Sequence, residues 1–156
     1  MEVGLLQQGQ HASMALLLCE LHAFYNPGAE VSPDVTLDHL TQRLLDPASG
    51  HTIVVAADGE GTVLGLAAYS FLYSLVHPSP EHRLQCMMKE LFVSRNARSG
   101  GIGKALMNQV IAQARAAGCG RMDWHVAEAN AAGIRFYESL GAEKVPGRLC
   151  YRLPLR

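Results

Sequence analysis

The stretch Arg98-Ser99-Gly100-Gly101-Ile102-Gly103-Lys104 decides the fold of this 156-residue chain. A strand-like run ends just before it, at Val93, and a run with helical periodicity begins at Ile102. The N-terminus of a helix presents unpaired backbone N–H groups and the positive end of the helix dipole, and glycines there let phosphate oxygens come close. Arg98 and Lys104 add positive charge on either side. The segment therefore predicts a phosphate-binding turn, although a glycine turn without a ligand is the simpler alternative.

Two familiar phosphate-binding motifs do not fit this turn. A P-loop needs glycine at the position of Arg98 and serine or threonine after Lys104, where Ala105 stands. A dinucleotide fingerprint needs a third glycine or alanine where Leu106 stands, and an acidic residue about 20 positions further on. Only Asp123 lies near that distance, which argues against an NAD site.

Hydrophobic patterns on both sides of the turn predict an α/β (α+β) protein with one sheet and helices on both faces. Each helix is bounded by a stop or cap signal, such as Asn26-Pro27 after the first, Ser32-Pro33 before the second and Gly118 after the third. The expected strands are residues 2–7, 52–57, 62–75, 84–93, 122–126 and 144–153, and the last helix is expected over residues 131–140.

Length and composition predict one domain over residues 1–156. With 49% hydrophobic residues, the chain can form a core without disulfides or a structural metal. The four cysteines are scattered, which is typical of a reducing compartment, and no His or Cys cluster has metal-ligand spacing. The N-terminus lacks a basic leader, and the early apolar run at residues 14–19 is too short to cross a membrane. We therefore expect a cytoplasmic protein with no metal and no membrane partner.

The net charge of −1 hides a division along the chain. Residues 1–60 hold eight acidic residues and one basic residue, a balance of −7, whereas residues 89–121 hold six basic residues and one acidic residue, a balance of +5. Chance scatter of surface charges is the plain explanation. The alternative is a polyanion near the second stretch and a cation near the first. Nucleic acid is not expected, because the basic stretch lacks interleaved aromatic residues and the chain is not basic overall.

The turn resembles the Arg/Gln-x-x-Gly-x-Gly/Ala signature of the GNAT acetyltransferase superfamily, in which Arg98, Gly101 and Gly103 take the fixed positions. The preceding strand and the Asn-Ala-Ala-Gly-Ile-Arg-Phe-Tyr-Glu-Ser-Leu-Gly-Ala segment at residues 130–142 are similar to the superfamily's neighbouring elements. Residues 126–130 followed by Phe136-Tyr137 resemble the diamine (spermidine/spermine) N-acetyltransferase branch in particular. The resemblance implies a mixed, centrally splayed sheet of six to seven strands.

The resemblance also implies acetyl-CoA as the co-substrate, lying where two neighbouring parallel strands splay apart. Backbone groups of the strand would pair with the pantetheine arm, amides of the turn would hold the pyrophosphate, and a residue of the second motif would contact the cofactor. Carried onto this chain, the implied contacts are Leu91, Phe92, Val93, Arg98, Ser99, Gly100, Gly101, Ile102, Gly103, Lys104, Asn130 and Tyr137.

Two side chains are the candidates for proton transfer. Attack of an amine on a thioester needs a neutral amine, and Glu90 is the only carboxylate in the strand segment before the turn that could act as general base. An ordinary surface or cofactor-side role for Glu90 is the alternative. Tyr137 matches the superfamily tyrosine that protonates the departing thiolate, although a packing role on its helix is the alternative. The diamine branch usually has two adjacent acids here, whereas this chain has Lys89 in the first place.

The leading hypothesis is an acetyl-CoA-dependent N-acetyltransferase that acts on a small, cationic primary amine by direct transfer in a ternary complex. Two alternatives stay open: a CoA-binding sensor or interaction module that lost transfer, and an acetyltransferase of protein or peptide amines. The superfamily often pairs through its substrate-side strands, and the run at residues 62–75 is long and apolar, so we also expect a homodimer.

Overall fold

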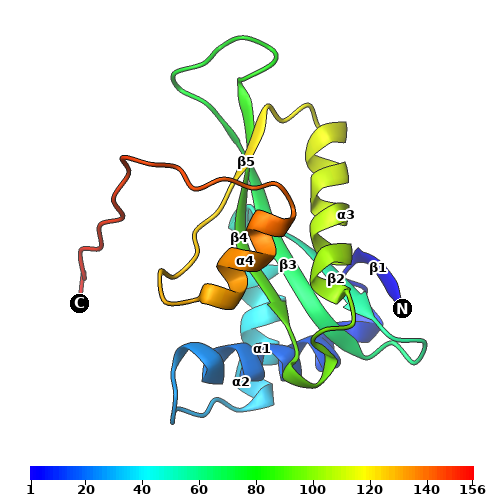
Figure 1. Cartoon of the computed structure of the whole chain (residues 1–156). Coiled ribbons are helices and arrows are strands. Elements are labelled where there is room, and N and C mark those ends of the chain that lie inside the picture. Colours follow the sequence, from blue (N-terminus) through cyan, green and yellow to red (C-terminus); the bar gives the residue numbers. More distant parts are fainter. The chain divides into compact units, whose positions relative to one another are not determined.

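A computed structural model describes all residues 1–156 of the chain (Figure 1). It contains two compact units, Met1–Trp124 and His125–Arg156. The first unit holds one sheet and three α-helices, and the second holds the helix α4 (Ala131–Ser139). None of the helices combines the length and the apolar character that crossing a bilayer requires. The organisation of the whole chain as a single domain stays a prediction.

The sheet of the first unit has five strands in the order β1-β2-β3-β4-β5. The first four pair antiparallel, whereas β5 lies parallel to β4 because the chain crosses over through α3 before it enters β5. The mixed sheet with helices therefore agrees with the predicted fold class. The strands are β1 (Glu2–Leu5), β2 (Thr52–Ala57), β3 (Val63–Tyr73), β4 (Leu84–Val93) and β5 (Arg121–Asp123).

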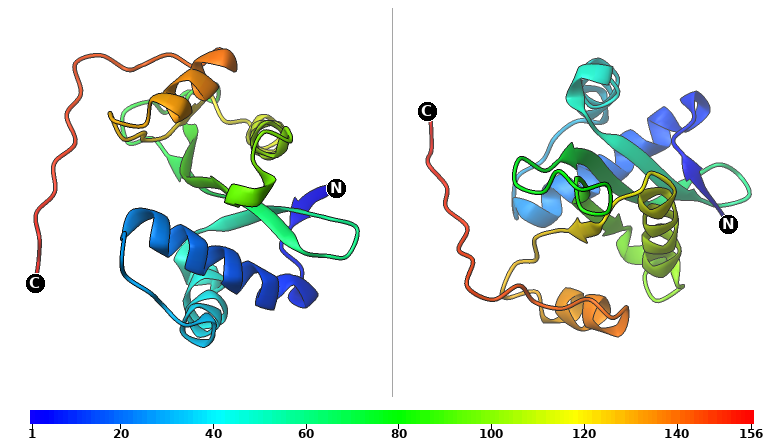
Figure 2. Two further views of the ribbon diagram at one scale, coloured as in Figure 1. Left: turned by 60° about the horizontal axis from the view of Figure 1, so that its bottom comes forward. Right: turned by 90° about the horizontal axis from the view of Figure 1, so that it is seen from above.

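Helices cover both faces of this sheet, as predicted. Figure 2 shows α1 (His11–Tyr25) and α2 (Pro33–His39) on one face and α3 (Ile102–Ala116) on the other. Local signals set their ends: the Ser32 side chain accepts a hydrogen bond from the Val35 amide at the start of α2, and Gly118 follows α3 with a positive φ of 81°.

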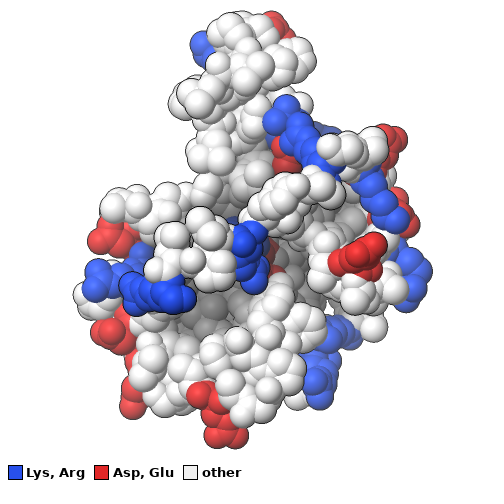
Figure 3. All heavy atoms as spheres, turned by 90° about the vertical axis from the view of Figure 1, so that its left-hand side faces the viewer, with Lys and Arg blue, Asp and Glu red and all other residues white.

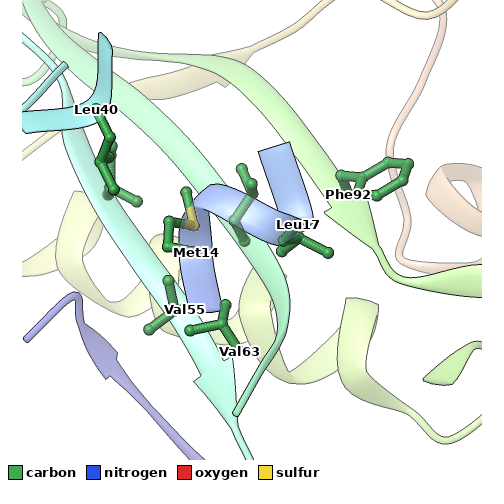
Figure 4. Packing of buried hydrophobic residues seen from close by; sticks show 8 residues of the cluster. Met14, Leu17, Leu40, Val55, Val63 and Phe92 are labelled. Atoms are coloured by element: carbon green, nitrogen blue, oxygen red, sulfur yellow. The ribbon is translucent and has the colours of Figure 1, made fainter. Parts of the chain in front are cut away.

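The core under α1 and α2 is a cluster of aliphatic side chains and one aromatic ring (Figure 4). Full burial of each such side chain contributes about 1.5–3 kcal/mol to the stability of the fold. Burial of this cluster therefore stabilises the packing of α1 and α2 on the sheet. The cluster consists of Met14, Leu17, Leu40, Ile53, Val55, Val63, Leu66 and Phe92.

The opposite face packs closely against α3. Gly65 in β3 lies under the helix, where a Cβ atom would stand 3.1 Å from both Ile102 and Leu106 and 3.0 Å from the Phe92 carbonyl oxygen. The Tyr69 hydroxyl, further along the same strand, hydrogen bonds to Gln113 of α3. A methyl group at position 65 would therefore require the neighbouring atoms to move by a few tenths of an ångström.

The sheet differs from the expectation in its strand count. The predicted last strand over residues 144–153 is absent, so the sheet has five strands rather than six to seven. Pro146 cannot donate to a ladder and Gly147 has a positive φ of 74°, and both interrupt extended backbone. The strand expected over residues 122–126 is also shorter, because its ladder with β4 ends at Asp123.

We expect Gly65→Ala to lower the free energy of unfolding by about 1–3 kcal/mol, because the neighbouring atoms must move to admit the methyl group. The measurement is urea unfolding followed by circular dichroism. Gly4→Ala is the matched control, because Gly4 is also a strand glycine but has no atom within 4 Å of the added Cβ. Equal stability of the two variants would contradict the close approach of α3.

Candidate functional site

The edge of β4 that faces β5 is open over half of its length. The parallel ladder joins only Gln85, Cys86 and Met87 of β4 to β5. From Met88 to Val93, no strand lies on this side of β4. Backbone groups on that edge therefore have no partner strand, although the Val93 carbonyl accepts a hydrogen bond from Arg98.

Along β4, successive residues direct their backbone groups alternately to β3 and to the open edge, and one hydrogen bond to β3 shows which residues face which side. The Ser94 amide donates to the Leu64 carbonyl of the preceding segment at 2.9 Å. Because bonded and non-bonded pairs alternate along antiparallel strands, Phe92 also directs its N–H and C=O to β3. The backbone groups of Leu91 and Val93 point to the open edge instead. Of the three predicted pantetheine contacts, these two have the suitable orientation.

A β-bulge in β4 determines where Glu90 points. Ala68 of β3 lies opposite Glu90, but the next residue, Tyr69, lies opposite Met88, so Lys89 is an extra residue in β4. Without the bulge, Glu90 and Met88 would share a face. With it, Met88 is buried opposite Tyr69 on the α3 face, whereas Glu90 turns to the face covered by α1.

On that face, the Glu90 carboxylate meets the last turn of α1. The Tyr25 hydroxyl donates to Glu90 Oε1 at 3.2 Å. Burial raises the pKa of Glu90 above its usual value of 4.5, whereas the bond from Tyr25, the Leu91 amide and the Lys89 charge act to lower it. The balance is a partly buried carboxyl group that accepts a proton more readily than an exposed one.

The turn after β4 has the backbone that its glycines predict. Ser99 and Gly101 have positive φ angles of 66° and 77°, and Gly101 is the N-cap residue of α3. No side chain caps the helix. The Ala105 amide is bonded to the Gly101 carbonyl, whereas the amides of the preceding helical turn have no partner within the helix. These amides and the positive end of the helix dipole form a site suited to an anion.

Arg98 fastens this turn to the end of β4. Its Nε donates to the Val93 carbonyl oxygen at 3.0 Å. Its guanidinium carbon lies 5.5 Å from the ring centroid of Phe92 and 5.9 Å from that of Phe24, which are cation–π distances. The side chain that the sequence offered as a phosphate contact therefore has an architectural role as well.

In the second unit, Asn130 begins α4. Its Oδ1 accepts a hydrogen bond from the Gly133 amide at 2.9 Å, and Gly133 has no Cβ that would collide with the Asn130 side chain. Tyr137 is half-buried on the same helix, with its ring packed edge-on to Phe136 at 5.2 Å. Asn130 thus has a capping role that the sequence reasoning had not assigned.

Three residues at the site were missed from the sequence: Glu20, Phe24 and Tyr25, all in α1. The Glu20 carboxylate accepts a hydrogen bond at 2.7 Å from the amide of Arg95, just before the turn. Their contacts span at least 65 residues along the chain, so no local pattern reveals them. The one available signal was an aromatic pair placed at the end of a helix, before Asn26.

Two of the eight acidic residues in the N-terminal 60 positions accept hydrogen bonds from nearby amides. Asp46 caps a short 3-10 turn, and Asp58 accepts hydrogen bonds from the Glu60 and Thr62 amides in the β2–β3 hairpin. Figure 3 shows positive and negative groups interspersed on one face of the molecule. The structure also brings no three His, Cys, Asp or Glu side chains together as a metal site.

A family model described as the acetyltransferase (GNAT) family matches residues 16–142. The chain is also similar to L-ornithine N5-acetyltransferase NATA1 of Arabidopsis thaliana, with 38% identity over 56 residues. That match spans 36% of this chain and only a quarter, 25%, of the relative's length.

Solved structures share the fold over nearly the whole chain. The integron cassette protein VCH_CASS6 from the mobile metagenome of V. cholerae has a TM-score of 0.87 at 28% identity, covering 98% of this chain and 91% of that one. An acetyltransferase of Trypanosoma brucei gives 0.73 at 20% identity, covering 97% and 99%. A ribosomal-protein-alanine N-acetyltransferase of Brucella melitensis gives 0.75 at 19% identity, covering 98% and 100%.

Glu90→Gln should make the protein more stable at pH 7. Because the folded pKa of Glu90 is raised above 4.5, the carboxyl group lowers stability above its folded pKa, and this cost disappears as the pH falls below the unfolded value. The variant should therefore lose its advantage below about pH 4.5. Urea unfolding across this pH range measures it. Glu2→Gln, at an exposed glutamate in β1, is the control and should change stability by less than about 0.5 kcal/mol. A Glu90 variant that is less stable at pH 7 would contradict the raised pKa.

Proposed function

The chain belongs to the acetyltransferase (GNAT) family, and we propose that it transfers an acetyl group from acetyl-CoA to a primary amine of a small, cationic substrate. The observation that carries the proposal is the continuity of β4 with the turn. One strand has an open edge from Met88 to Val93, presents Glu90 beside that edge, and leads directly into the uncapped start of α3.

Acetyl-CoA would lie along this strand and end at the turn. The Leu91 carbonyl and the Val93 amide would bond to the amides of the pantetheine arm, because Arg98 already occupies the Val93 carbonyl and Glu90 the Leu91 amide. The side chain of Phe92 would pack beneath them in the core. The amides of residues 99–104 would hold the pyrophosphate, with Lys104 as a counter-charge. Asn130 would contact the cofactor through its Nδ2, because its Oδ1 caps α4.

The reaction would need three proton transfers. Glu90 would accept a proton from the ammonium group of the acceptor, and the resulting amine nitrogen would attack the thioester carbonyl carbon. Collapse of the tetrahedral intermediate would form the amide bond and break the carbon–sulfur bond. The CoA thiolate would then take a proton from the Tyr137 hydroxyl, and the phenolate so formed would take the surplus proton from the new amide nitrogen. A carboxyl group whose pKa is raised by burial suits the first step, because it binds a proton more readily than an exposed carboxylate.

The acceptor is proposed to be a diamine or a basic amino acid. The similarity to an ornithine N5-acetyltransferase and the resemblance of residues 126–130 to the diamine branch both favour an ω-amine. Lys89, in place of the first of two acids, would reduce the attraction for a second ammonium group. The carboxylate of a basic amino acid would offset its second ammonium group, so ornithine or lysine fits this change better than a diamine or a polyamine.

We also propose that the protein forms a homodimer and is located in the cytoplasm. A homodimer would cover the end of β3, where Phe71, Leu72 and Tyr73 are exposed in the single chain. A cytoplasmic location would supply acetyl-CoA and keep the four cysteines reduced.

Incubation with acetyl-CoA and a panel of amines, read by release of free thiol, tests the transfer reaction. We expect turnover with ornithine, lysine or a short diamine. Glu90→Gln and Tyr137→Phe should each lower kcat about 10²-fold or more, because each removes a proton-transfer group, while the Kd for acetyl-CoA stays within about twofold. Binding of acetyl-CoA with no turnover on any amine would favour the sensor module instead.

Removal of one positive charge tests the cofactor site separately. Lys104→Gln should weaken binding of CoA several-fold, with a smaller effect at high salt because the contact is electrostatic. Arg115→Gln is the matched control, because it removes a charge in the last turn of the same helix, α3, at the end opposite the turn. Isothermal titration of CoA into each variant gives the comparison. Equal weakening by both variants would point to a general charge effect rather than a site at the helix start.

A further inference from the structure

The last turn of α1 touches both parts of the proposed site. Phe24 lies 5.9 Å from Phe92 of β4 and packs edge-on to its neighbour Tyr25 at 5.2 Å, measured between ring centroids. The Arg98 guanidinium lies over the Phe24 ring. These contacts orient the end of the helix, so that Tyr25 reaches Glu90 with a defined geometry although 65 residues separate them.

We propose that Tyr25 is a positioning residue for Glu90: its hydroxyl holds Oε1 of the carboxylate, so that Oε2 is left to meet the acceptor amine. This role rests on the proposed function, in which Glu90 receives the proton. Tyr25 itself neither accepts nor donates a proton in the reaction, and it acts only through the carboxylate.

Among the groups around Glu90, the Tyr25 hydroxyl is the one that most stabilises the ionised carboxylate. From α1, Tyr25 donates to the carboxylate and lowers its pKa most, and on β4 itself the Leu91 amide and the Lys89 charge have smaller effects of the same sign. The residue opposite on β3 is the uncharged Ala68. Burial, followed by the Glu90 charge, raises the pKa of Tyr25 above 10, so the phenol stays a donor at neutral pH.

Loss of the Tyr25 hydroxyl should change the pKa of Glu90 in a predictable direction. A hydrogen bond to the charged form of an acid lowers its pKa, so removal of the Tyr25 hydroxyl should raise the pKa of Glu90 further. The acid limb of the profile of kcat/KM against pH should then move to higher pH. A purely structural role for Tyr25 would leave the position of that limb unchanged and alter only the stability.

The first experiment compares Tyr25→Phe with the unmodified protein in full pH profiles. We expect kcat/KM at neutral pH to fall about 2- to 10-fold, as for the loss of one hydrogen bond, with recovery as the pH rises. The Kd for acetyl-CoA should not change. Tyr73→Phe is the matched control, because it removes a phenol hydroxyl from an exposed residue at the end of β3 and should leave the profile in place.

A double-mutant cycle tests whether Tyr25 acts through Glu90. In the Glu90→Gln background, addition of Tyr25→Phe should change kcat by less than about twofold, since the carboxylate that it positions is gone. Multiplicative losses in the double variant would overturn the proposal.

Carbon-13 titration of the Glu90 carboxyl group gives a readout that needs no activity. A raised pKa in Tyr25→Phe, together with a shifted acid limb, supports the proposal. An unchanged carboxyl pKa overturns it, and so does a raised carboxyl pKa with an unmoved acid limb. If the unmodified protein acetylates no amine, the proposed function fails and the positioning role fails with it. That outcome is seen before any variant is compared.

Discussion

One extra residue in β4 organises the site. The bulge at Lys89 reverses the side to which β4 side chains point, so that Met88 packs under α3 whereas Glu90 reaches the face covered by α1. A bulge also increases the local twist of the strand that contains it. The ladder with β5 ends at Met87, two residues before the bulge, and from there the edge of β4 is open. The redirected carboxylate and the start of the unpaired strand edge therefore lie within a few residues of one insertion in the register.

In the turn at residues 98–104, backbone conformation and charge both shape the start of α3. Ser99 and Gly101 have positive φ angles in the eight-residue connection between the end of β4 at Val93 and the start of α3 at Ile102. Arg98 holds the turn against the strand end through the Val93 carbonyl and two aromatic rings. Its charge is thus placed by contacts within the fold, and what makes the turn suited to an anion is mainly its uncapped amides. The glycine pattern is therefore more informative about this site than the count of basic residues.

Sequence reasoning predicted the local elements well and the long-range contacts poorly. The bounds of β2 and β4 agree with their hydrophobic runs, and the ends of α1 and α3 agree with Asn26 and Gly118, because caps and periodicity are local properties. The expected strand at residues 144–153 failed because a strand needs a partner, which alternation alone does not supply. The bulge and the Tyr25–Glu90 bond depend on strand register and on helix placement. Neither leaves a mark in the residues concerned.

The uncapped start of α3 has a thermodynamic consequence. Most helices complete their first turn with a serine, threonine or aspartate side chain, but here Gly101 supplies none. An anion bound at these amides would provide the missing acceptors, so that the ligand serves as the N-cap of the helix. By linkage, its binding free energy also stabilises the folded chain. The affinity of this turn for its ligand and the stability of the helix that follows are then two measures of one set of hydrogen bonds.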